Sequence, residues 1–332
     1  MAAGLLPPRD RQPRGGGPDA GGAAAVRAVT GAGRETAVGR ETGARPEAGA
    51  GAEKGAWPEA GRVGPYRLWG RLGVGAGGSV FVGQARGRGR LVAVKALHGE
   101  AEGLGERVAK VRELLAESEV AARCFPAVDG AEAAGERPWV ASELVDEPGL
   151  EATVVSAGPW PVHAVRALGA ALAAGLAAAH RVRLVHGGVR PSHVRVTEDG
   201  PRLLDLGTSD LETGVSTRVS DRLRAYTAPE QLAGHRPTPY ADVFALAGVL
   251  VFALSGHPPS EQESDGRAVR DPALRRLLTR CRSHTLTDRP TAAELSRLLL
   301  PDDVDAPPFS ALLPPSVREA VARRRSGGPT IG

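Results

Sequence analysis

The sequence predicts an α+β protein with two lobes, a small one built on strands and a larger one built on helices. Short β-type segments separated by Gly-rich turns begin at Tyr66, and the last of them covers residues 138–145. The chain then becomes mainly helical, with Ala/Leu-rich segments at residues 162–180 and 241–255. A strand-rich part followed by a helix-rich part is typical of two such lobes.

The elements follow in a definite order along the chain. Strands are expected at residues 66–72, 79–84 and 91–97, where apolar runs alternate with Gly-rich turns. Residues 104–123 favour a helix, and residues 138–145 read as a further strand. We expect a first lobe at residues 66–146 and a second at 147–300, within a folded domain of residues 63–300.

The two ends of the chain differ from this domain in composition. Gly (44) and Pro (27) form about a fifth of the 332 residues, less than in a wholly low-complexity protein. Residues 1–62 are mostly Gly, Ala, Pro and Arg, and cannot bury enough apolar surface to offset the entropy of ordering, so we expect a disordered arm. Residues 301–332 read as a linker and a short basic tail, in which residues 314–325 are either a short basic helix or a loosely docked tail.

Charge and cysteine content exclude several classes of protein. The net charge is +4, but the arginines are scattered among 38 acidic residues without a basic stripe, so no nucleic-acid partner is expected. Only Cys124 and Cys281 are present, too few for a disulfide framework, and both are expected to be buried and reduced.

Hydropathy predicts no membrane segment. The longest apolar runs, at residues 167–179 and 243–254, are shorter than the roughly 20 residues that span a bilayer. The N-terminus has no basic start followed by an apolar stretch, so no secretory signal is expected. We therefore expect a soluble, cytoplasmic protein.

A Gly-rich turn lies between the first two expected strands. Gly73, Gly75 and Gly78 fit the pattern Gly-x-Gly-x-x-Gly-x-Val, which ends at Val80. Glycines let backbone amides approach phosphate oxygens. The turn runs into a strand rather than into a helix, which argues against a dinucleotide-binding fold.

Lys95 ends the apolar run Val92-Ala-Val-Lys95, in a chain whose only other lysines are Lys54 and Lys110. A buried ammonium is costly unless anions pair with it, so we expect Lys95 to hold a phosphate and a carboxylate. The alternative is a lysine at a strand edge that extends to water.

These features resemble the serine/threonine protein kinases, particularly the bacterial type, and the resemblance extends from about Tyr66 to Leu300. It implies a two-lobed protein-kinase-like fold that binds ATP and Mg²⁺. Lys95 would contact the α and β phosphates and pair with a glutamate of the following helix. Glu113 is our first choice for that partner and Glu117 the second, although a glutamate on a helix rich in glutamate more often lies on a solvated face.

The resemblance also implies a nucleotide pocket. Residues 139–145 resemble the strand that leads to the family's hinge, with Ser142 at the gatekeeper position. The residues expected to bind the cofactor are Leu72, Gly73, Gly75, Gly78, Val80, Ala93, Lys95, Glu113, Glu143, Val145 and Asp205.

The segment from Leu184 to Val194 resembles the family's catalytic loop, His-Arg-Asp-Leu-x-x-x-Asn, with its main residues changed. His186 keeps the first histidine, and the positions that follow carry Gly187 for arginine, Gly188 for the proton-accepting aspartate, Arg190 for lysine and His193 for the metal-binding asparagine. Glycine cannot accept a proton, and a positioned general base contributes roughly 10² to 10⁴ in rate. His193 is either a polar loop residue or a metal ligand through neutral imidazole, although Mg²⁺ prefers oxygen.

Two later segments resemble other parts of the family's C-terminal lobe. Leu203-Leu-Asp205-Leu-Gly resembles the Asp-Phe-Gly motif, which implies that Asp205 holds Mg²⁺. Residues 225–230 resemble the end of the activation segment, where Arg222-Leu223 replaces the usual Gly-Thr.

Asp242 and Arg289 match architectural residues of the family, and the resemblance implies a buried pair of Arg289 with Glu230. The scaffold of the second lobe is therefore expected to be intact.

Three hypotheses of function follow. The first is a pseudokinase that binds ATP and Mg²⁺ and signals to an unknown protein partner. The second is an active serine/threonine kinase of low rate, with the activation-segment residues Thr208, Ser209, Thr213, Ser216 and Thr217 as candidate phosphosites. The third, a small-molecule phosphotransferase of the antibiotic-kinase type, is disfavoured by the Ala-Pro-Glu and Asp-Arg-Pro-Thr segments.

Overall fold

The computed structural model describes residues 61–327, except 76, 87–88, 99–100, 135–137, 209–220, 261–268 and 301–306. All of them belong to one compact unit, Gly55–Gly332. The predicted disordered arm lies outside the described residues up to residue 60. The same holds for four of the candidate phosphosites, Ser209, Thr213, Ser216 and Thr217.

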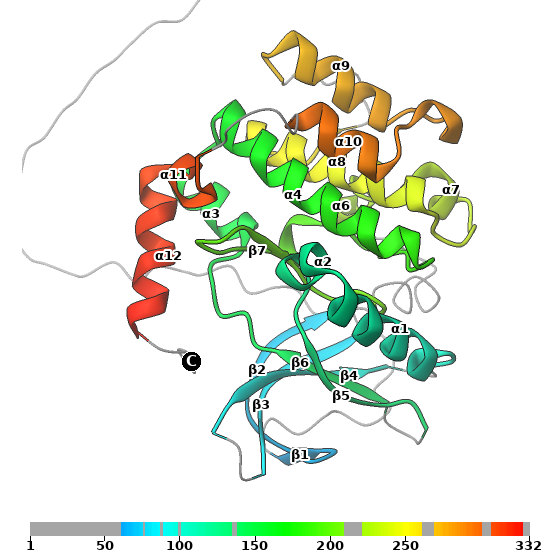
Figure 1. The fold of residues 1–332 in the computed structure, drawn as a ribbon, viewed down its shortest axis with the longest axis vertical. Helices are drawn as coiled ribbons and strands as arrows, with labels where there is room; N and C mark the ends of the chain where they lie inside the picture. The colour runs from blue at the N-terminus through cyan, green and yellow to red at the C-terminus, as the bar shows by residue number, and fades with distance from the viewer. Residues whose placement is uncertain are drawn as a thin grey trace, which may run out of the picture. The chain divides into compact units, whose positions relative to one another are not determined.

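The described residues form a lobe built on a β-sheet and a lobe built on helices, which confirms the predicted fold class (Figure 1). The elements are, in chain order, β1 (Gly61–Val63), β2 (Tyr66–Gly75), β3 (Gly78–Ala85), β4 (Leu91–Leu97), α1 (Leu104–Glu117), α2 (Glu119–Cys124), β5 (Val128–Glu132), β6 (Trp139–Glu143), α3 (Leu150–Ala157), α4 (Val162–Arg181), η1 (Pro191–His193), β7 (Val194–Val196), β8 (Pro201–Leu203), α6 (Asp221–Arg224), α7 (Pro229–Leu232), α8 (Pro239–Ser255), α9 (Pro272–Cys281), η2 (Leu286–Asp288), α10 (Ala292–Leu299), α11 (Phe309–Leu312) and α12 (Pro315–Gly327).

The sheet of the first lobe is antiparallel, in the order β1-β2-β3-β4-β6-β5. The strand β4 has the bounds predicted from its apolar run and pairs with β3 on one side and with β6 on the other. A central strand is buried between two neighbours, which suits its Val- and Leu-rich sequence. This position buries Lys95 inside the sheet lobe.

The helix predicted over residues 104–123 is two helices, α1 and α2, which meet at Ser118. Ser118 is extended, with φ −125° and ψ 107°, and its hydroxyl accepts a hydrogen bond from the backbone N–H of Ala121 at 3.3 Å. The hydroxyl of a serine can hydrogen-bond to nearby backbone groups in place of the helical hydrogen bonds. Serine is therefore more favourable at a helix cap than in a helix interior. The prediction of one helix missed this cap.

The second lobe is organised around the apolar helices α4 and α8, near the centre of the helical part of Figure 1. A side chain at Gly175 of α4 would lie 2.3 Å from the sulfur of Cys124, so this glycine lets α2 pack directly on α4. By length and composition α4 could cross a membrane, but 67% of its most apolar window is buried inside the protein, as in a core helix. Both cysteines are free and buried.

The C-terminal helix α12 packs on the helical lobe, beside α3 (Figure 1). Leu313, Val317 and Val321 recur at helical spacing and are 1–3% exposed, within the same apolar core as α4 and α8. Arg324 lies 3.4 Å from the carboxylate of Asp146, just after β6. Of the two alternatives for residues 314–325, the structure therefore has the helix, packed on the helical lobe, and not the loosely docked tail.

Candidate functional site

Lys95 lies in the middle of β4, opposite Val80 of β3 and Val140 of β6, and is only 6% exposed. Its ammonium donates a hydrogen bond to Asp205 Oδ2 at 3.0 Å. The two residues come from different lobes, and their opposite charges compensate each other where neither could be buried alone. Asp205 is thus the described carboxylate partner of Lys95.

Asp205 follows β8 in a left-handed backbone conformation, with φ 71°. This conformation is costly for a residue with a side chain, and the surrounding loop supports it. The N–H of Thr208 donates to the carbonyl of Asp205 at 3.1 Å, and the Thr208 hydroxyl donates to the same oxygen at 3.2 Å. Burial opposes ionisation of Asp205, but the charge of Lys95 and the hydrogen bond from its ammonium hold the pKa of Asp205 well below the usual range.

Thr208, the one candidate phosphosite among the described residues, is 3% exposed. Its hydroxyl is occupied by the hydrogen bond to Asp205. A kinase could not reach this oxygen without opening the loop, so the structure gives Thr208 a supporting role at Asp205.

The expected partner of Lys95 on helix α1 requires a correction. Glu113 and Glu117 are both exposed, and no ion pair joins either of them to Lys95 within the described part of the chain. The helix instead turns Val111 toward Lys95. Val111 belongs to the buried face of α1 with Leu104, Val108 and Leu114.

The signal for this orientation was present in the sequence. Apolar residues at spacings of three and four mark the face of a helix that packs inward, and Glu113 lies off that face. The prediction of Glu113 or Glu117 rested on the glutamate-rich composition of α1 rather than on this apolar spacing. Val111, Lys95, Asp205 and Ser142 all line one small cavity of about 30 Å³, which places the predicted gatekeeper next to Lys95.

The Gly-rich turn is the hairpin between β2 and β3, in which Gly73 pairs with Val80 and Gly75 with Gly78. The three glycines have different surroundings. A side chain on Gly78 would lie 2.2 Å from the backbone oxygen of Ala96, so packing against β4 requires a glycine there. Side chains on Gly73 or Gly75 would meet nothing within 4 Å, which leaves room beside their backbone for a ligand.

The remaining residues of the predicted nucleotide pocket lie on the same strands and on the segment after β6. Leu72 is 51% exposed, Val80 and Ala93 are half-buried, and Val145 is buried. Glu143 accepts a hydrogen bond from Arg202 Nη2 at 2.8 Å, which ties β6 to β8. The sequence analysis did not predict this link between the lobes.

The catalytic-loop segment is held by the buried carboxylate of Asp242. Its Oδ2 accepts hydrogen bonds from the backbone N–H of His186 at 2.9 Å and from His180 Nε2 at 2.8 Å. Its Oδ1 accepts from the N–H of Gly187 at 2.8 Å. Asp242 therefore sets the backbone of the loop, and His180 is a partner that the sequence analysis missed.

The ring of His186 continues this network. Its Nδ1 accepts a hydrogen bond from the N–H of Gly188 at 3.2 Å, so the ring proton is on Nε2, which donates to the carbonyl of Leu204 at 2.8 Å. Burial lowers the pKa of His186, which keeps the ring neutral. The loop is thus ordered without any side chain at Gly188, where the family has its proton acceptor.

His193, at the position of the family's metal-binding asparagine, is 6% exposed. Its Nε2 lies 3.6 Å from Asp205 Oδ2, and its Nδ1 is buried with no hydrogen-bond partner among the described residues. Burial lowers the pKa of His193 well below its usual value. The backbone N–H of His193 donates to the carbonyl of Arg190, a half-buried residue of the same loop.

Asp205 and His193 differ in how well they suit Mg²⁺. The carboxylate of Asp205 is the kind of ligand that Mg²⁺ prefers, whereas the imidazole of His193 is better suited to softer metals. Of these two side chains, Asp205 is therefore the one that could hold Mg²⁺.

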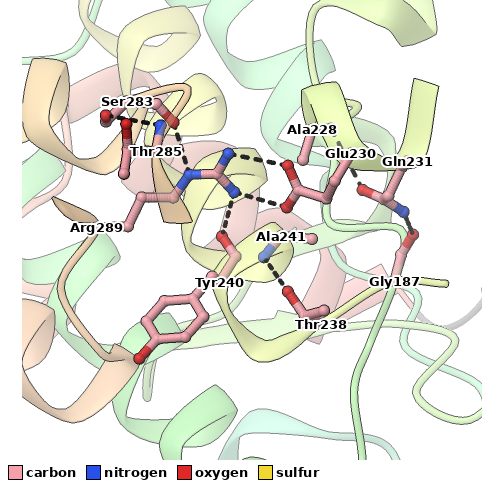
Figure 2. Close-up of polar contacts among 10 residues, drawn as sticks. All are labelled: Gly187, Ala228, Glu230, Gln231, Thr238, Tyr240, Ala241, Ser283, Thr285 and Arg289. Atoms are coloured by element: carbon pink, nitrogen blue, oxygen red, sulfur yellow. Dashed lines mark hydrogen bonds and ion pairs between the residues drawn. The ribbon is translucent and has the colours of Figure 1, made fainter. Parts of the chain in front are cut away.

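A second network of buried charges lies at the end of the activation segment (Figure 2). Arg289 donates to both carboxylate oxygens of Glu230, at 2.8 and 2.9 Å, and to the carbonyls of Ser283 at 2.8 Å and Tyr240 at 3.1 Å. Burial opposes the ionisation of Glu230, but the hydrogen bonds from Arg289 lower its pKa. The same figure shows Gln231 Nε2 donating to the carbonyl of Gly187 at 3.2 Å, which joins this network to the catalytic loop.

Leu223 replaces the family's threonine just before this network. Its backbone carbonyl accepts the hydroxyl of Thr227 at 2.9 Å. Its aliphatic side chain has no group that could hydrogen-bond to the catalytic loop. The catalytic loop and the activation segment therefore lack the polar side chains that the family has at the positions of Gly188 and Leu223.

Comparisons with known proteins agree with this geometry. Residues 66–300 match the protein kinase domain. The chain is 36% identical to the serine/threonine-protein kinase AfsK of Streptomyces coelicolor over 81% of its own length, and 35% identical to the probable serine/threonine-protein kinase PkwA of Thermomonospora curvata over 74%. It spans 36% of the length of each relative. The crystal structure of the PknI kinase domain of Mycobacterium tuberculosis has a TM-score of 0.55 and 25% identity, covering 74% of this chain and 98% of that domain.

Proposed function

The chain belongs to the protein kinase family, and we propose that it binds ATP and Mg²⁺ at Lys95 and Asp205 but transfers the γ-phosphate slowly or not at all. The single observation that carries this proposal is the contrast between the Lys95 and Asp205 pair, 3.0 Å apart, and Gly188, an ordered loop position without a side chain.

Two features support nucleotide binding: the charge of Lys95 and the open space beside Gly73 and Gly75. An ammonium has three N–H donors, so Lys95 can hold the carboxylate of Asp205 and a phosphate oxygen together. The open surroundings of Gly73 and Gly75 allow phosphates to approach the backbone of the hairpin. Bound Mg²⁺ would neutralise charge on the phosphates, and Asp205 would supply its protein ligand.

The proposed loss of phosphate transfer rests on the residues that would face the phosphoacceptor hydroxyl. A phosphoacceptor hydroxyl needs a group that orients it and takes its proton, and a positioned base contributes roughly 10² to 10⁴ in rate. Gly188 offers no such group, and Leu223 offers none beside it. We infer a protein that signals through its nucleotide-bound state to a partner protein.

The alternative is an active serine/threonine kinase of low rate, and one observation favours it. Phosphoryl transfer depends mainly on positioning and on neutralising charge, and the residues for both are in place in Lys95, Asp205 and the Arg289 scaffold. Its substrate would then be a serine or threonine of a protein, as the names of the relatives indicate for those proteins.

The test compares ATP binding with transfer. Thermal unfolding of the full chain is followed with and without ATP and Mg²⁺, and transfer of labelled γ-phosphate to a generic protein substrate is measured in parallel. The variants are Lys95→Met and Gly188→Asp. The matched control is Lys110→Met, which removes a partly exposed lysine that pairs with Glu106 on α1.

We expect ATP with Mg²⁺ to raise the melting temperature of the wild type and of Lys110→Met, and to leave Lys95→Met unchanged. We expect no transfer by the wild type and measurable transfer by Gly188→Asp. Transfer by the wild type that disappears in Lys95→Met would overturn the proposal in favour of the active kinase. Absence of any ATP effect on the wild type would overturn nucleotide binding itself.

A further inference from the structure

Two buried arginines contact the same aromatic ring, that of Phe244 in α8. The guanidinium carbon of Arg289 is 5.0 Å from the ring centroid, and that of Arg282 is 4.2 Å from it. Arg289 is matched by the carboxylate of Glu230 and by two backbone carbonyls (Figure 2). The surroundings of Arg282 are different.

Arg282 lies just after α9 and is 8% exposed. Within the described ranges, the one hydrogen bond of its side chain runs from Nη1 to the carbonyl of Ala225 at 3.1 Å, and its Nε is buried without an acceptor. No described carboxylate forms an ion pair with it. Stacking on Phe244 compensates only part of the cost of burying a guanidinium.

The charge of Arg282 is nevertheless maintained. Burial lowers its pKa to about 10, which still leaves the guanidinium protonated at neutral pH. A protonated guanidinium has five N–H donors in a planar fork, which matches the oxygens of a phosphate. An anion at this position would use donors that the described protein leaves unused.

Arg282 lines a cavity of about 470 Å³ between α6, α8 and the end of α9. We call this cavity the Arg282 pocket and define it by Arg224, Thr227, Leu232, Phe244, Arg282 and His284, which line it. Arg224 and His284 are exposed at its rim. No aspartate or glutamate is among the described residues that line it.

Arg282 and His284 also line a second cavity, which includes Asp288. The carboxylate of Asp288 accepts a hydrogen bond from the Ser283 hydroxyl at 3.0 Å. Asp288 is not among the described residues that line the Arg282 pocket.

We propose that the Arg282 pocket binds a phosphate monoester carried by a polypeptide, a phosphorylated serine or threonine side chain. The guanidinium groups of Arg282 and Arg224 would contact the phosphate oxygens, with the Thr227 hydroxyl and His284 beside them. The apolar walls formed by Leu232 and Phe244 would take up the side chains next to the phosphorylated residue. None of these residues belongs to the Lys95 and Asp205 site, so the inference does not depend on the proposed function.

The experiment uses the full chain at constant ionic strength and measures fluorescence anisotropy of a labelled peptide with a central phosphoserine between leucine and proline. The same peptide without phosphate and inorganic phosphate as competitor are the other two probes. The main variant is Arg224→Gln with His284→Gln, because both side chains are exposed and neither takes part in the described packing. A second variant, Arg282→Lys, keeps the charge but removes the planar fork.

We expect the phosphopeptide to bind at least tenfold more tightly than the unphosphorylated peptide, and the rim variant to lose that difference at an unchanged melting temperature. Arg282→Lys should weaken binding in the same way. The control Arg276→Gln, an exposed arginine of α9 outside the pocket, should bind like the wild type.

Equal binding of the two peptides, or a phosphopeptide affinity unchanged by the rim variant, would overturn the proposal. Competition by inorganic phosphate at the same concentration as the phosphopeptide would overturn its assignment to a polypeptide.

Discussion

The buried charges near Lys95 and those around Arg289 are stabilised in different ways. Around Arg289 the guanidinium is paired with Glu230 and two carbonyls, and Asp242 accepts three hydrogen bonds. At the nucleotide side, His193 keeps a buried ring nitrogen without a described partner, and the Asp205 side chain is 25% exposed. The buried groups around Arg289 have their partners inside the protein and support the fold, whereas the ring nitrogen of His193 and the partly exposed Asp205 are groups that a ligand could contact.

The largest effect on stability is expected when Arg289 is removed. Arg289→Ala leaves the carboxylate of Glu230 without its partner, and we expect a loss of about 3–5 kcal/mol in the free energy of unfolding, because breaking a buried ion pair strands the remaining charge. Urea denaturation measures it. The exposed control Arg276→Ala should change stability by less than about 0.5 kcal/mol. A loss below about 1 kcal/mol for Arg289→Ala would contradict the structural role of this network.

A smaller effect is expected at Asp242, which links the scaffold to the catalytic loop. Asp242→Asn replaces one acceptor oxygen by an NH₂ group, and we expect a loss of about 1.5–3 kcal/mol, the range for hydrogen bonds to a charged group. Hydrogen exchange at the amides of His186 and Gly187 should become faster. The control is Asp271→Asn, at the N-cap of α9, where asparagine caps as well as aspartate. Unchanged exchange at both amides would count against Asp242 as the support of the loop.

The smallest effect concerns the neutral histidines of the site. Burial lowers the pKa values of His186 and His193. At a pH between the folded and the unfolded pKa, the unfolded chain therefore binds protons that the folded chain does not. Their contribution to stability is present above the unfolded pKa of about 6.5 and is lost as the pH falls through the lower folded values, by at most about 1.4 kcal/mol per pH unit for each group. The lowered pKa of Asp205 acts below about pH 4 and does not enter this window.

Urea denaturation between pH 5 and 8 tests this prediction. The fall in stability toward pH 5 should be shallower in His193→Gln than in the wild type, while the exposed control His98→Gln should match the wild type. Identical slopes for all three proteins would show that His193 is not kept neutral by the fold.

The strands and long helices could be predicted from the sequence because their apolar patterns are local. The strand β4 and the helix α4 are examples, and the pairing of Lys95 with an acid followed from the cost of a buried ammonium. What the sequence did not provide depends on how elements rotate and dock. The contact of His180 with Asp242 arises from packing between segments distant in the chain. The inward turn of Val111 and the cap at Ser118 are local features that the apolar spacing of α1 and the serine itself indicate, and the prediction missed them.

The docking of α12 means that the stretch recognisable as a kinase domain is shorter than the stretch that folds together. The family match ends at residue 300, yet Leu313, Val317 and Val321 complete the interior of the helical lobe, and Arg324 reaches Asp146 beyond the last sheet strand. A chain cut at the family boundary would expose the apolar surface that these side chains cover and would remove the contact of Arg324 with Asp146. A shortened version that keeps this interior covered therefore has to include Arg324.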